Sequence, residues 1–302
     1  MSPSDQPVVS VVIPCFNQGR FLADAIDSVL GQTHRAEVIV VDDGSTDNTL
    51  AVVKNYAGVE LIQQRNQGAA VARTSGLRQS RADFVVFLDA DDRLLPEAVA
   101  TGLEYLSMHR DWAFVTGHAR LIDVDGSVIG TPPQDHGTGS SYVELLRANH
   151  VWAPGVVMYR RSVLQTVGAF STWARGSADY ELNIRIARSF AFGCHHQVVL
   201  EYRRHGANMS TDIGYMLQSA VTVRRFERRY VRGDSTAEQA WREGMAFVRS
   251  DFGRRLVHQV RSDFRTPGRR QRALRGLLDL LRYYPAGLLR VARAAAHRAA
   301  RL

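Results

Sequence analysis

The sequence has few cysteines and no long apolar run. Cys15 and Cys194 are its two cysteines, too few for a disulfide framework, and this scarcity favours a reducing compartment. No run approaches the ~20 apolar residues needed to span a bilayer. The first fourteen residues, MSPSDQPVVSVVIP, lack the basic and apolar regions of a signal peptide. These absences predict a cytoplasmic protein.

The formal charge of +8 is unevenly distributed along the chain. Residues 254–302 contain thirteen arginines and two aspartates, a balance of +11, which leaves −3 for residues 1–253. No nucleic-acid-binding motif accompanies the basic segment, so we expect no nucleic-acid partner.

The basic segment has the pattern of amphipathic helices. Arg290, Arg293, His297 and Arg301 recur at spacings of three and four, and upstream arginines surround a set of leucines, namely Leu274, Leu277, Leu278 and Leu281. Such helices can lie in an anionic membrane interface. They can also pack on the rest of the protein or on a partner subunit, and the pattern leaves both interpretations open.

Short apolar runs alternate with helical patterns over the first third of the chain. Strands are expected at 8–13, 37–41, 59–62 and 84–88, and helices at 19–31, 47–56, 67–79 and 96–108. Further on, a hairpin is expected at 112–130, strands at 155–159 and 198–202, and a helix at 179–189, with helices throughout from about residue 212. This order predicts an α/β fold with a mostly parallel, Rossmann-like sheet covered by helices and a helical C-terminal extension.

Polar residues follow three of the expected strands, at the edge where open α/β sheets bind ligands. They are Asn17, the pair Asp42 and Asp43, and the acids of the run FVVFLDADD at residues 84–92. Because like charges repel, the crowding of Asp89, Asp91 and Asp92 predicts a cation among them.

Several kinds of acidic site can be compared with this run. An EF-hand loop is excluded, because Arg93 and Leu94 stand at its fifth and sixth positions. A phosphoaspartate-type phosphatase or receiver domain would use Asp89 as nucleophile but needs a later lysine, and the single lysine, Lys54, lies upstream. Neither a P-loop nor a G-x-G-x-x-G motif is present. The acids could cap the next helix, or could hold Mg²⁺ or Mn²⁺ together with substrate phosphates.

Seven segments of the sequence, taken together, indicate a protein family more specifically than the run at 84–92 does alone. They are residues 8–33, EVIVVDDGSTDNT from residue 37, RNQGAAVARTSGL from 65, FVVFLDADD from 84, GAF at 168–170, SADYELNIRIA at 177–187 and YRRHGANMS at 202–210. In this order they resemble the family 2 glycosyltransferases. The resemblance implies a GT-A fold, a nucleotide-sugar donor (a UDP-sugar above all), a divalent cation (Mn or Mg) and inversion at the anomeric carbon.

The resemblance also implies a domain organisation. A GT-A glycosyltransferase domain is expected at 1–210, with a nucleotide-sugar half at about 1–117 and an acceptor half at about 118–210, followed by the helical basic extension at 211–302. A phosphoaspartate-type phosphatase and a non-catalytic nucleotide-sugar-binding protein are the alternatives.

Individual site residues follow from the same resemblance. It implies that Pro14 and Phe16 line the base pocket, that Asp43 accepts a hydrogen bond from the uracil imide, and that Arg73 lies near the nucleotide. Asp91 corresponds to the metal ligand, Asp89 to the acid that contacts ribose or metal, and His205 to a histidine that completes the metal or diphosphate site.

The resemblance assigns the catalytic base to Asp179, with Glu181 as the second candidate. The family pattern has two successive acids here, and this chain has Ala178 before Asp179. Trp152 and Trp173 flank the acceptor region and could stack on sugar rings or pack in the core. The acceptor is expected to be a glycan or a lipid-linked glycan of bacterial surface polysaccharide or glycolipid synthesis, with the basic helices placing the enzyme on the inner face of the cell membrane.

Overall fold

The structure is a computed structural model that describes residues 8–134, 141–206 and 208–291. The chain divides into two compact units. The first comprises residues 1–145, 149–173 and 178–205, and the second comprises residues 146–148, 174–177 and 206–302.

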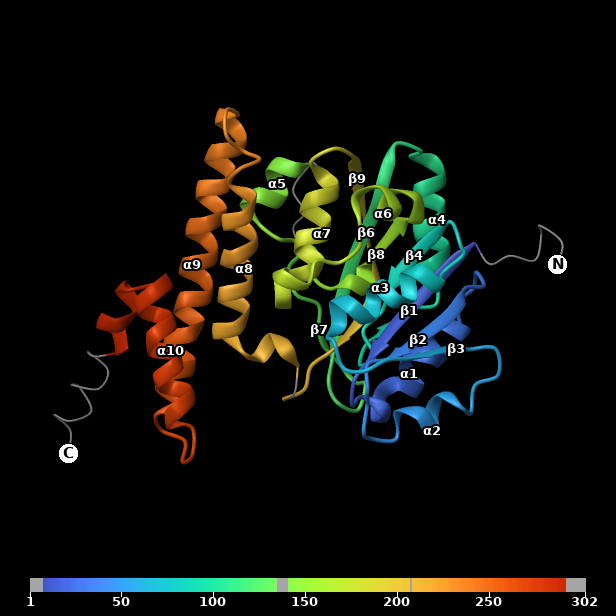
Figure 1. Cartoon of the computed structure of the whole chain (residues 1–302), viewed down its shortest axis with the longest axis horizontal. Helices are drawn as coiled ribbons and strands as arrows, with labels where there is room; N and C mark the ends of the chain where they lie inside the picture. Colours follow the sequence, from blue (N-terminus) through green and yellow to red (C-terminus); the bar gives the residue numbers. More distant parts are fainter. Residues whose placement is uncertain (1–7, 135–140, 207, 292–302) are drawn as a thin grey trace. The chain divides into compact units, whose positions relative to one another are not determined.

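Four parallel strands open the first unit, in the order β3-β2-β1-β4. They are β1 (Val9–Cys15), β2 (Glu37–Asp42), β3 (Glu60–Gln63) and β4 (Phe84–Phe87), and they alternate with α1 (Gly19–Leu30), α2 (Thr49–Val53) and α3 (Ala69–Gln79). All seven residues of β1 are buried, as expected for a β-branched strand covered on both faces. The predicted alternation of strands and helices is confirmed (Figure 1).

Beyond β4 the sheet becomes mixed: the predicted hairpin at 112–130 is confirmed, whereas the antiparallel direction of the strand at 157–160 was not predicted. β8 (Val157–Arg160) runs antiparallel to β4 and to β6 (Trp112–Ile122), whereas β6 runs parallel to β9 (Ala191–Arg203). Two short strands, β5 (Arg93–Leu94) and β7 (Val128–Gly130), pair antiparallel with β9 and β6. The helices between them are α4 (Ala98–Met108), α5 (Tyr142–Arg147), α6 (Arg161–Val167) and α7 (Ala178–Ala187).

The second unit is helical. It contains α8 (Ile213–Glu227), α9 (Ser235–Asp263) and α10 (Arg270–Tyr283), and α9 packs against both of the others (Figure 1). Its core is formed by apolar residues of the three helices, among them Leu217, Val221, Leu256, Val260 and Leu280. Within the described part of the chain, no helix is long and apolar enough to cross a membrane.

The predicted helix at 286–302 can be followed only in part. Residues 286–291 are helical, and residues 292–302 lie outside the described ranges.

Candidate active site

The loops after β1 and β2 are joined by hydrogen bonds between their polar residues. Asn17, in the left-handed region at φ 53°, donates its backbone N–H to Ser45 Oγ (2.9 Å) and accepts from the Thr46 N–H through Oδ1 (2.8 Å). The turn needs Gly44, whose φ is +79° and where an added Cβ would lie 2.9 Å from the Asn66 nitrogen. The two loops therefore form one surface at the carboxyl edge of the sheet.

Pro14 and Phe16 differ in their exposure. Pro14 is buried within β1, whereas Phe16 follows the strand with 46% of its surface exposed. Phe16 is thus not a core aromatic, and its ring is available to a planar ligand at this edge.

Asp43 is buried and holds the loop that leads into α3. Its Oδ1 accepts from Gln64 Nε2 (2.7 Å) and the Gln67 N–H (2.9 Å), and its Oδ2 accepts from the Gly68 N–H (2.8 Å). The carboxylate therefore fixes the start of α3, from which Arg73 projects.

Each of the three acids after β4 contacts a different partner. Asp89 forms an ion pair with Arg73. Asp91 Oδ2 lies 2.9 Å from His205 Nε2. The third, Asp92, is 1% exposed, and its Oδ1 accepts from the Arg203 backbone N–H at 2.9 Å.

Arg203 is a buried cation at the end of β9, 1% exposed, that the sequence analysis did not single out. Its guanidinium donates to the carbonyls of Asp91 (2.8 Å) and Val124 (2.8 Å) and to Asp24 Oδ2 (2.6 Å). It also lies over the Phe21 ring, 4.7 Å from the ring centroid. Arg203 thereby joins the loop that contains Asp89, Asp91 and Asp92, called the acidic loop below, to α1 and to the turn before β7.

Asp179 lies in the first turn of α7, within the electrostatic reach of Arg73 and Asp89. Burial raises the pKa of the Asp179 carboxyl, and the positive charge of Arg73 partly opposes that rise. Burial alone would lower the pKa of Arg73, but the charges of Asp89 and Asp179 outweigh it and raise that pKa. Residues of α3, of the loop after β4 and of α7 therefore share one electrostatic environment.

Two buried polar residues support this group. Tyr159 on β8 donates its hydroxyl to Asn183 Oδ1 on α7 at 2.6 Å. Burial raises the pKa of Tyr159 further above its ordinary value, with a contribution from the charge of Asp179. The pair fixes α7 to the sheet beside Asp179, and a single sequence gives no signal of it.

Glu181 has a structural partner. It is 2% exposed and pairs with Arg185 (2.8 Å), which also donates to the carbonyls of Gly168 and Ala169. Glu181 thus anchors the GAF segment, and Asp179 is the stronger candidate for a base.

The two tryptophans are accessible to different degrees. Trp152 is 41% exposed, and Trp173 is half-buried. Trp152 is therefore available for stacking on a ligand. The alternative prediction, that Trp152 packs in the core, is wrong.

The residues at Asp91 fit a hard divalent cation. Adjacent ligands of an octahedral ion with bonds of about 2.0–2.1 Å lie about 3 Å apart, close to the 2.9 Å between Asp91 Oδ2 and His205 Nε2. A carboxylate oxygen is the ligand type that Mg²⁺ and Mn²⁺ prefer. Asp89, by contrast, is engaged by Arg73.

A parallel sheet with an acidic loop at its carboxyl edge, extended by strands of mixed direction, defines a GT-A type of fold. Solved structures share it. The chain superposes on a mannosyltransferase, PcManGT from Pyrobaculum calidifontis, in complex with GDP-Man and Mn²⁺ (TM-score 0.63, 19% identity, 99% of this chain and 81% of that one). It also superposes on S. aureus TarS 1-349 in complex with UDP-GlcNAc (TM-score 0.62, 17% identity, 78% and 71%).

Sequence comparison identifies the family. Residues 10–168 match the family described as "Glycosyl transferase family 2". The chain belongs to this family, and the predicted resemblance is confirmed. It is also 36% identical over 129 residues to the "Putative teichuronic acid biosynthesis glycosyltransferase TuaG" of Bacillus subtilis, a match that covers 40% of this chain and 50% of that relative's length.

Proposed function

We propose that the chain is an inverting, metal-dependent glycosyltransferase. It would move a sugar from a nucleotide-diphosphate donor, a UDP-sugar, to a hydroxyl acceptor in bacterial surface polysaccharide or glycolipid synthesis. The observation that carries the proposal is the grouping of Asp179, Arg73 and Asp89, because it unites the expected base with the expected donor-binding residues. The UDP-GlcNAc bound to TarS and the name of TuaG support the donor and the pathway class.

The nucleotide would bind over the loops after β1 and β2. The exposed ring of Phe16 can stack on the base, and buried Pro14 lies in β1, the strand that presents this ring. Asp43 remains our candidate for base recognition, either directly or through the 64–68 segment that it holds. Arg73 can reach the donor only if it shares its guanidinium with Asp89, so we place both residues beside the ribose and diphosphate.

Asp91 and His205 would hold Mn²⁺ or Mg²⁺, with Asp89 as a further ligand candidate. A bound divalent cation would neutralise the charge that develops on the departing diphosphate. The chain's own residues orient the site: the Asp91 carbonyl is held by Arg203, and His205 lies against Phe21, with ring centroids 5.1 Å apart.

Asp179 would act as general base. A carboxylate whose pKa is raised by burial is a stronger proton acceptor than an ordinary aspartate, and the positive charge of Arg73 limits that rise. It would take the proton of the acceptor hydroxyl as that oxygen attacks the anomeric carbon and the bond to the nucleoside diphosphate breaks. Trp152 and Trp173 are our candidates for stacking on the acceptor.

Product analysis tests this proposal. The full chain would be incubated with Mn²⁺, acceptor extracts and UDP-, dTDP- or GDP-sugars, and the anomeric configuration of the product determined by NMR. We expect Asp179→Asn to lower kcat by about 10²–10⁴-fold while UDP affinity is retained. Glu181→Gln is not a neutral control because Glu181 pairs with Arg185, so exposed Glu104→Gln on α4 serves instead.

Three experimental outcomes distinguish this proposal from the alternative functions. No transfer and no donor hydrolysis with any sugar nucleotide would contradict the proposal. A phosphatase would instead trap a phosphate mimic at Asp89. A non-catalytic binder would retain nucleotide affinity and show no turnover in the unsubstituted chain.

We also propose that α10 contacts an anionic membrane surface. Leu274, Leu278 and Leu281 recur at spacings of four and three and are 56%, 66% and 60% exposed, with exposed Arg275 and Arg282 between or beside them. Its opposite face, with Leu280 and Tyr283, packs in the helical core. An apolar stripe flanked by arginines is suited to an interface of anionic lipid.

Vesicle flotation tests this second proposal. Replacing the three exposed leucines with serine should abolish binding to anionic vesicles, and binding of the unsubstituted chain should weaken with salt. Phe247→Ser on α9, which is 55% exposed, is the matched control and should still float. Equal flotation of the triple variant and the control would refute it. The triple substitution is preferable to deletion of α10, because deletion would uncover the core around Leu280.

A further inference from the structure

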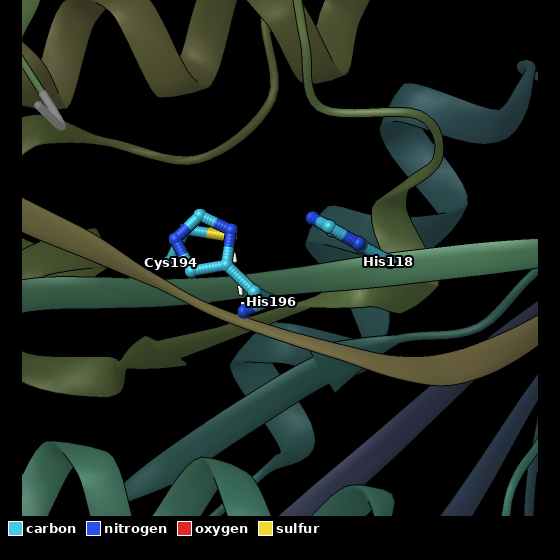
Figure 2. A group of neighbouring side chains, drawn as sticks. All are labelled: His118, Cys194 and His196. Atoms are coloured by element: carbon cyan, nitrogen blue, oxygen red, sulfur yellow. Dashed lines mark hydrogen bonds between the residues drawn. The ribbon is translucent and has the colours of Figure 1, made fainter. Parts of the chain in front are cut away.

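Three side chains with nitrogen and sulfur ligand atoms lie together away from the acidic loop. His118 comes from β6 and Cys194 and His196 come from β9, and one ligand atom of each lies within 4.8 Å of the others. Figure 2 shows the two imidazoles and the thiol on the same side of these neighbouring strands. Cys194 Sγ and His196 Nδ1 are 3.8 Å apart.

An irregularity in the β6–β9 ladder builds this cluster. Thr116 pairs with Cys194 and His118 pairs with Val198, so β9 has two more residues than β6 across this step. The extra length forms a bulge in which His196 has a φ of 57°. A non-glycine residue in this region is strained, and bulges and such strain concentrate at functional sites.

The neighbouring residues accommodate the bulge. An added Cβ at Gly117 would lie 2.3 Å from His195 Cε1, so this glycine makes room for the His195 ring. His195 is buried, and its ring packs against Tyr105 at 5.4 Å between centroids. With His195 packed in this way, Cys194 and His196 are left to face His118.

We propose that His118, Cys194 and His196 form a transition-metal site that takes Zn²⁺. One thiolate and two imidazoles are a ligand set that zinc prefers, whereas Mg²⁺ and Mn²⁺ prefer oxygen. In a tetrahedral site with Zn–S of about 2.3 Å and Zn–N of about 2.0–2.1 Å, sulfur and nitrogen lie about 3.6 Å apart. The 3.8 Å between Cys194 Sγ and His196 Nδ1 is close to that spacing.

Zinc binding at this cluster requires no other reactant. Burial lowers the pKa of the His118 imidazole, which favours its neutral, ligating form. Burial raises the pKa of the Cys194 thiol, so zinc would displace that proton to solvent as the Zn–S bond forms. The three side chains fill three positions of a tetrahedral ion and leave the fourth for water or another ligand.

The proposed zinc site uses different ligands from the proposed donor site and would have a different effect on the protein. It would link β6 to β9 where their ladder is irregular, and β9 continues from there to Arg203. Zinc is therefore expected to stabilise the strand that positions the acidic loop, without contact to the donor.

Metal analysis of the full chain, produced without a histidine tag, tests the inference. After treatment with chelator and equilibration with Zn²⁺ in excess Mg²⁺, we expect a single equivalent of zinc per chain. Substitution with Co²⁺ should produce a thiolate-to-cobalt charge-transfer band. Cys194→Ser should remove that band and lower zinc affinity at least ~10-fold, and His118→Ala should lower the affinity similarly.

Two controls separate this site from the rest of the chain. Cys15→Ser alters the other cysteine and Asp91→Asn alters the acidic loop, and both should retain the zinc and the cobalt band. If His118→Ala fails to fold by circular dichroism, His196→Gln on the exposed side of the cluster replaces it. Unchanged zinc affinity in Cys194→Ser, loss of zinc in Asp91→Asn, or no zinc bound by the unsubstituted chain would each overturn the proposal.

Discussion

Replacing Arg203 with methionine should destabilise the first unit and loosen the acidic loop. Methionine retains an unbranched apolar side chain against Phe21 but removes the guanidinium. That group donates to the carbonyls of Asp91 and Val124 and to the carboxylate of Asp24.

The size of the effect follows from the exposure of the three acceptors. The carboxylate side chain of Asp24 is 45% exposed, so water can replace its ion pair at a cost of about 0–1 kcal/mol. The two carbonyls face a side chain that is 1% exposed, and each would lose a donor at a cost of about 1–3 kcal/mol. The expected loss of unfolding free energy is therefore about 2–7 kcal/mol, dominated by the carbonyls.

Urea unfolding followed by circular dichroism measures this loss, and Mn²⁺ titration of the activity measures the loop. We expect a lower midpoint and a weaker apparent Mn²⁺ affinity for Arg203→Met. Arg204→Met, at the exposed next residue, is the matched control. Equal midpoints for the two variants would refute the assignment of Arg203 as the residue that holds the loop.

Three further predictions concern the site. Tyr159→Phe leaves Asn183 Oδ1 without its 2.6 Å donor and should cost about 1–3 kcal/mol of unfolding free energy, whereas a change below the error of urea unfolding would contradict the role of this pair. Burial raises the pKa of Asp179. As the pH falls, its carboxylate should therefore be protonated, and activity lost, at a pH above the ordinary aspartate pKa of ~3.9. Arg73→Gln removes the opposing charge and should move that acid limb of kcat/KM upward; an unmoved limb would argue against Asp179 as the base. Asp43→Ala releases the 64–68 segment and should weaken UDP binding in calorimetry more than it slows turnover at saturation, so unchanged affinity would exclude both proposed roles of Asp43.

The strands of the first half of the sheet could be predicted because their residues alone identify them. Val9–Cys15 and Glu37–Asp42 are β-branched runs that are buried almost throughout, and such runs have few alternatives to a covered parallel strand. β9 was predicted only at 198–202, whereas it spans Ala191–Arg203. Its first half contains polar residues and a bulge, and what makes it a strand is pairing with β6, eighty residues away in the sequence.

The candidate site shows the same division between local pattern and distant pairing. The order of acids at strand ends indicates where the site lies, because carboxyl ends of parallel strands share an edge. The partner of each acid is not a local property. Asp43 bonds to Gly68, and Glu181 is used by Arg185 to hold residues 168–169. A single sequence therefore predicts the edge on which the candidate site lies, but leaves Glu181 as a second candidate beside Asp179 for one role.

The crowded acids of the loop after β4 do not all have one purpose. Asp89 is neutralised by Arg73, Asp92 is buried and receives the Arg203 backbone N–H, and Asp91 faces the imidazole of His205. Of the three, Asp91 is the one whose carboxylate lies beside a histidine ring. A histidine can yield its position beside a carboxylate to a metal ion, since its neutral ring becomes a ligand itself, whereas an arginine cannot. We therefore place the proposed cation at Asp91.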